Sequence, residues 1–182
     1  MNIKRLYLLL FLFSSIYAQG LRVVHMEGTY DLDSDGLQEF ATVEKGFLNN
    51  NSVSLIRYYE INNDGYQQMN WELKAPDGLL GNFVDVELGD LNGDGIPELI
   101  TVSNLAEPNQ NELLQPIAFY YSWDGEKFNE TAGSVLNLSG GLSFVRAHNF
   151  SLIDYDGDMD QEIAVSLGSP LREIVILDIN QN

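Results

Sequence analysis

The chain has 182 residues, of which 45% are hydrophobic, so it is long enough and apolar enough to bury an ordinary core. Its formal net charge is −18, from 27 acidic and 9 basic residues, which argues against binding to nucleic-acid phosphates or anionic membranes. It contains no cysteine, which excludes disulfides, thiol catalysis and cysteine-ligated metal sites.

The N-terminal segment is typical of an export signal. Lys4 and Arg5 precede an unbroken apolar run, Leu6 to Phe13, and small residues follow up to Ala18. That run is too short to cross the roughly 30 Å hydrocarbon core of a membrane. We therefore expect a signal peptide at 1–18, a mature chain that is secreted or held at the cell surface, and no stable membrane insertion. A buried N-terminal strand or helix is the alternative.

The mature chain begins with a unit of strand-like runs around an acidic segment, Asp31–Glu39. An apolar run, 40–43, follows it at once. Two further runs, 53–59 and 66–71, flank Asp64-Gly65, and Asp-Gly between strand-like runs is a strong hairpin signal. The first unit therefore predicts four antiparallel strands.

The same order recurs twice. The second unit has an alternating strand at 83–88, an acidic segment at 90–98, strands at 99–102 and 117–121, and a hairpin at Asp124-Gly125 that leads into a fourth strand at 127–129. The third unit has an acidic segment at 154–162, a strand at 163–165 and a third strand at 172–177, and the chain stops at Asn182, before a fourth strand.

Four antiparallel strands in about 60 residues, repeated, are typical of β-propeller blades. We expect an all-β chain with blade 1 at about 21–74, blade 2 at about 82–132 and an incomplete blade 3 at about 142–182. Two and a half blades cannot close a ring of typically 4–8 blades. The prediction is therefore a partial propeller, either truncated or completed by a partner.

The three acidic segments share the pattern D-x-[DN]-x-D-x-x-x-E, which places oxygen ligands at alternate positions of a tight loop. Calcium takes 6–8 oxygens, and carboxylates, amides and backbone carbonyls all serve. We expect up to three Ca²⁺ ions, with a backbone carbonyl at position 7 of each loop. The predicted ligands are Asp31, Asp33, Asp35, Leu37 and Glu39; Asp90, Asn92, Asp94, Ile96 and Glu98; Asp154, Asp156, Asp158, Asp160 and Glu162.

Two alternatives bear on these loops. A single acidic run is most often a solvated turn, but the pattern should arise by chance only about 0.03 times in this composition, and it occurs three times. An EF-hand needs a glutamate at position 12 and flanking helices. Position 12 holds Thr42, Thr101 and Val165, and strand-like runs flank each loop.

The segment from Leu88 to Ile100 (LGDLNGDGIPELI) resembles the core of the FG-GAP/VCBS repeat, the blade unit of integrin-alpha-type propellers. The resemblance implies that a metal ion braces the loop between two strands of a blade, and it does not imply catalysis. In the third loop Met159 stands where the family has glycine. We therefore expect that loop to bind metal more weakly or not at all.

No catalytic constellation stands out, and His25 and His148 have no evident partners. The aromatic residues, Tyr58, Tyr59, Trp71 and Trp123 among them, favour core packing over a sugar-stacking face. We expect a non-catalytic adhesion or ligand-binding scaffold whose loops, such as 103–115, contact an extracellular protein or glycan. The alternative is the propeller portion of a larger polysaccharide-active enzyme.

Overall fold

The computed structural model describes residues 20–48, 51–74, 80–106, 115–129, 134–137 and 145–179. Over these ranges the chain is all-β, with three antiparallel sheets and no helix, as expected from the strand-like runs. It follows that no described helix could span a membrane. The predicted signal peptide at 1–18 lies outside the described residues.

The first sheet holds β1 (Leu21–Tyr30), β2 (Gln38–Leu48), β3 (Asn51–Ile61) and β4 (Gln67–Lys74), in that order. The hairpin predicted at Asp64-Gly65 connects β3 to β4. Gly65 has φ of 80°, a conformation that glycine adopts without steric cost, and its N–H donates to the Asn62 carbonyl over 2.8 Å.

The second sheet holds β5 (Leu80–Gly89), β6 (Glu98–Ala106), β7 (Gln115–Tyr121) and β8 (Ser134–Asn137), again in chain order. We expected the fourth strand of this sheet at 127–129, but that prediction is wrong: the fourth strand is β8. Phe128 instead forms an isolated bridge with Trp123, and β8 pairs with β7. The second sheet thus extends to Asn137.

The third sheet holds β9 (Ala147–Ile153), β10 (Glu162–Leu167) and β11 (Ile174–Leu177), with β10 in the centre. β11 is the strand that we predicted within 172–177. Ile174 and Ile176 on this strand are both exposed.

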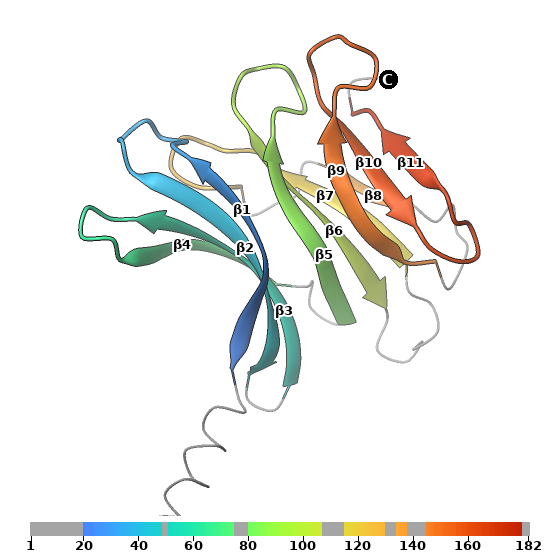
Figure 1. Cartoon of the computed structure of the whole chain (residues 1–182), viewed down its shortest axis with the longest axis horizontal. Coiled ribbons are helices and arrows are strands. Elements are labelled where there is room, and N and C mark those ends of the chain that lie inside the picture. Colours follow the sequence, from blue (N-terminus) through green and yellow to red (C-terminus); the bar gives the residue numbers. More distant parts are fainter. Residues whose placement is uncertain are drawn as a thin grey trace, which may run out of the picture.

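The three sheets pack face to face, with the second sheet between the other two (Figure 1). Because side chains alternate along a strand, β6 serves both interfaces: Leu99 packs in the core shared with the first sheet, and Ile100 in the core shared with the third. Tyr58 and Trp71 join the first core, whereas Tyr59 stacks on Phe40 on the outer face of the first sheet. The prediction of core packing is confirmed for Tyr58 and Trp71, whereas Tyr59 lies outside that core.

The first strands of the sheets, β1, β5 and β9, are tied to one another near their ends. The Tyr30 hydroxyl donates to the Leu88 carbonyl over 3.1 Å, and the Leu152 N–H donates to Glu87 over 3.0 Å. Each of these strands leads directly into an acidic loop. All three loops therefore emerge at the same edge of the molecule (Figure 1).

Candidate metal centres

The three acidic loops have nearly the same backbone conformation. Position 4 has positive φ in each loop, at Ser34, Gly93 and Gly157, and so has position 6, at Gly36, Gly95 and Met159. These two turns wrap the chain so that alternate side chains share one side of the loop.

A repeated set of hydrogen bonds fixes each loop. The glutamate at position 9 is almost fully buried in all three loops (Glu39 2% exposed, Glu98 2%, Glu162 3%), and it accepts a hydrogen bond from the backbone N–H at position 2. The side chain at position 5 accepts from the N–H at position 7, as Asp35 does from Leu37 over 2.7 Å. The loop therefore forms around its own carboxylates.

In the first loop, Asp31, Asp33, Asp35 and Glu39 each offer a carboxylate oxygen, and these oxygens all lie within 4.8 Å of one another. Glu39 Oε2 is bonded to Leu32, but Glu39 Oε1 is buried and has no hydrogen-bond partner in the described structure. The donor set consists of oxygens alone, and one buried oxygen lacks a partner. This arrangement fits a hard divalent cation.

Burial raises the pKa of Glu39, and the nearby carboxylates of Asp33 and Asp31 raise it further. The bond from Leu32 N–H and the neighbouring Tyr58 hydroxyl act in the opposite direction. The buried Tyr58 hydroxyl lies beside Glu39, and burial together with this carboxylate raises the pKa of Tyr58. A bound cation would relieve the repulsion among these carboxylates.

The second loop differs at position 3, which is Asn92. Its Nδ2 donates to Glu98 Oε1 over 2.8 Å, so the oxygen that is unpaired in the first loop is paired here. Asp90 accepts from Gly95 N–H, and Asp94 accepts from Ile96 N–H. Burial raises the pKa of Glu98, and Asp94 and Asp90 add to the effect. The predicted ligands of the second loop thus lie in the expected loop, namely Asp90, Asn92, Asp94 and Glu98. A hydrogen bond from the Asn92 side-chain amide occupies Glu98 Oε1.

The third loop brings Asp154, Asp156 and Glu162 within 4.8 Å of one another. Asp158 is not part of that group; its carboxylate accepts from Asp160 N–H over 3.0 Å. Asp154 accepts from Gly157 N–H at position 4, whereas Asp31 and Asp90 accept from the glycine at position 6. The third loop therefore departs from the others where Met159 replaces glycine.

Asp160, the residue at position 7 of the third loop, does not lie within its own loop alone but contacts the second loop. The side chain of Asp160 lies against the second loop, where a Cβ atom on Gly93 would come within 2.2 Å of Asp160 Oδ1. The Gln161 N–H donates to the Asp90 carbonyl over 3.2 Å. The second and third loops are thus in contact, a relationship that the sequence pattern does not contain. Leu37 and Ile96 stand at the matching position, just before β2 and β6.

Comparisons with known proteins agree with this geometry. Residues 31–101, which include the first two loops, match the family model of an FG-GAP-like repeat. A search of curated proteins finds no match. The resemblance predicted from the second loop is confirmed: the segment 31–101 is similar to an FG-GAP-like repeat.

Proposed function

We propose that this chain is a calcium-binding module of β-propeller type that acts outside the cell as a non-catalytic adhesion or ligand-binding scaffold. The observation that carries the proposal is the group of Asp31, Asp33, Asp35 and buried Glu39, whose carboxylate oxygens all lie within 4.8 Å of one another. FG-GAP repeats are typically extracellular, which supports export.

The propeller assignment rests on how the sheets are arranged. Successive antiparallel sheets pack face to face, their first strands are neighbours, and their acidic loops share one edge. A closed ring of typically 4–8 such blades would also cover the outer faces of the first and third sheets.

Calcium would act as a brace. Glu39 begins the buried part of β2, and Asp31 directly follows β1, so an ion held by both would fix the connection between the two strands. Such a role stabilises the scaffold and leaves recognition to other surfaces. Of the loop that we expected at 103–115 to contact a partner, residues 103–106 belong to β6 and 107–114 lie outside the described residues.

The experiment is a thermal melt with calcium, with magnesium and with chelator. A ligand that binds only the folded state stabilises it by RT ln(1 + [L]/Kd), about 2.7 kcal/mol at a hundredfold excess over Kd. The Asp31→Asn/Asp35→Asn variant should lose part of the response to calcium. Asp64→Asn, which changes an exposed hairpin acid, is the matched control. A melting temperature that is indifferent to calcium and to chelator would refute the proposal.

A further inference from the structure

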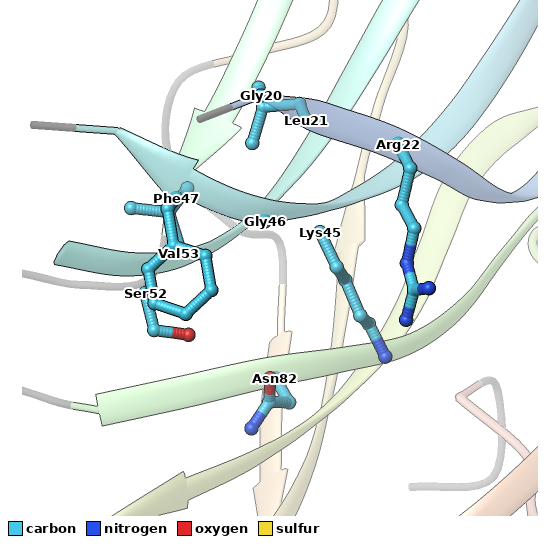
Figure 2. Close-up of a pocket in the computed structure, with 9 residues that line it drawn as sticks. All are labelled: Gly20, Leu21, Arg22, Lys45, Gly46, Phe47, Ser52, Val53 and Asn82. Atoms are coloured by element: carbon cyan, nitrogen blue, oxygen red, sulfur yellow. The ribbon is translucent and has the colours of Figure 1, made fainter. Parts of the chain in front are cut away.

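A cavity of about 560 Å³ lies between the first and second sheets, at the end of β1 opposite to its acidic loop. Its walls come from the start of β1, the end of β2, the start of β3 and Asn82 on β5 (Figure 2). The apolar core of this interface includes Val43 of β2. Two residues further along, on the same face of the strand, the side chain is Lys45, so the interface changes from apolar to cationic.

Arg22 and Lys45 form the cationic wall of this cavity. They are direct cross-strand partners, and like charges in that position destabilise a sheet. Figure 2 shows both side chains extending from their strands toward β5. Neither forms an ion pair with a carboxylate of the described residues. Two adjacent cations without an ion pair among the described residues stand out in a chain of net charge −18.

The electrostatic surroundings of Lys45 favour an anion beside it. Burial lowers the pKa of Lys45, Asp85 acts to raise it, and Arg22 adds to the lowering. Asp85 offsets part of the charge of Lys45, but its carboxylate is shared with His25 Nε2, which it contacts at 2.8 Å, and with the Val86 N–H, from which it accepts. An anion between the two cations would relieve their repulsion.

The other residues that line the cavity can bind a small cyclic molecule that carries hydroxyl groups. Phe47 is 51% exposed although it stands two residues after Lys45 on the same face of β2, so its ring is free to stack. The Ser52 hydroxyl and the Asn82 amide are exposed, and each can donate and accept hydrogen bonds. The volume falls within the range of small-molecule sites.

We propose that this cavity binds an acidic sugar: a saccharide ring whose carboxylate lies between Arg22 and Lys45 and whose face stacks on Phe47. The inference deepens the ligand-binding role proposed above and rests on it. The cavity and the first acidic loop are at opposite ends of β1, so ligand binding and the calcium response can be measured separately.

The test is a titration of the whole chain with D-galacturonate, followed by calorimetry and by NMR shifts at one fixed calcium concentration. Arg22→Gln and Lys45→Gln should each weaken binding about tenfold, because each removes a charge-assisted contact. Lys127→Gln, which alters an exposed cation outside the cavity by the same charge, should leave the affinity unchanged. Affinity should also fall as ionic strength rises.

Three results would overturn the inference: no binding of galacturonate, binding that neither substitution weakens, or equal binding of neutral D-galactose. Inorganic sulfate that binds as tightly as galacturonate would show an anion site without sugar recognition, and this too would overturn it. A cooperative thermal unfolding transition of Arg22→Gln and Lys45→Gln, like that of the parent, shows that the variants are folded. The response of their melting temperatures to calcium, measured separately, keeps a failure of the sugar site distinct from a failure of the calcium proposal.

Discussion

Met159 has the same left-handed backbone conformation as Gly95, with φ of 83° at both residues. A side chain in this conformation brings Cβ close to the following carbonyl oxygen, at a cost of about 1–2 kcal/mol. The Met159 side chain is 86% exposed, so packing does not offset that cost. The third loop therefore keeps the backbone of the repeat although its sequence does not favour it.

Replacing Met159 with glycine should stabilise the protein. We expect Met159→Gly to raise the free energy of unfolding by about 1 kcal/mol in chelator, because strain is removed while little burial is lost. Urea denaturation measures this. Met69→Gly is the matched control: Met69 is 49% exposed on β4, and glycine there should lower stability. A loss of stability in Met159→Gly would contradict the reading of strain at this turn.

Much of the fold was predictable because its signals are local. Alternation, Asp-Gly turns and the acidic pattern give residue ranges that overlap eight of the described strands, and the third sheet contains the expected third strand. β1 and β9 were expected only as strands that lead into an acidic loop. The sequence did not predict β8, because Phe128 follows the turn at Gly125 and therefore favours a fourth strand at 127–129. In the structure Phe128 is a fully buried residue that packs edge-on against Tyr58, with ring centroids 5.1 Å apart. A contact between two sheets determines its place.

The loops were predictable as donor sets but not as geometries. The pattern treats aspartate and asparagine at position 3 as equivalent oxygen ligands. Met159, at the position of the glycine, led us to expect weaker metal binding in the third loop than in the second. The structure shows that Asn92 also donates to Glu98, and that three carboxylates gather in the third loop. Contacts such as Asp160 with Gly93 join different repeats. No property of a single repeat reveals them.

Exchanging aspartate and asparagine at position 3 should change the calcium affinity of the first two loops in opposite directions. Asn92→Asp removes the donor that occupies Glu98 Oε1 and adds a charged ligand, so the affinity of the second loop for calcium should rise about tenfold. Asp33→Asn should lower the affinity of the first loop by a similar factor. Calorimetric titration with Ca²⁺ measures both changes. An unchanged isotherm in both variants would show that position 3 does not contribute to binding.

Glu87 should make the stability of the protein depend on pH. Burial raises its pKa, and the nearby Asp85 and Glu27 raise it further. Because the folded state binds the proton more tightly, the contribution of Glu87 is fully present below its unfolded pKa of about 4.5 and is lost as pH rises through the folded value. Glu87→Gln retains an acceptor for Leu152 N–H and should be more stable than the parent at pH 7.

Urea denaturation in chelator between pH 4.5 and pH 7 tests this difference, with the exposed Asp64→Asn as the control for a general change in charge. The gain in stability from Glu87→Gln should shrink as the pH falls, since the parent's glutamate becomes protonated. A gain that stays constant over the range would mean that Glu87 does not titrate differently in the folded state.

Arg57 joins two carboxylates on the outer face of the first sheet, and its loss should destabilise the fold. It donates to Glu44 and to Glu72, each over 2.8 Å, and the Tyr59 hydroxyl also donates to Glu44. Glu44 is only 5% exposed. Arg57→Ala would leave this buried charge with the Tyr59 and Thr42 hydroxyls alone, so we expect a loss of about 3 kcal/mol.

Lys74→Ala provides the comparison, because Lys74 contacts the same Glu72 at 3.0 Å but its side chain is 69% exposed. Exposed ion pairs contribute at most about 1 kcal/mol, so this variant should be near neutral. The double variant Arg57→Met/Glu44→Met should recover most of the stability lost in Arg57→Ala, because it removes the uncompensated charge together with its partner. Equal losses in Arg57→Ala and Lys74→Ala, measured by urea denaturation, would show that Glu44 does not depend on Arg57.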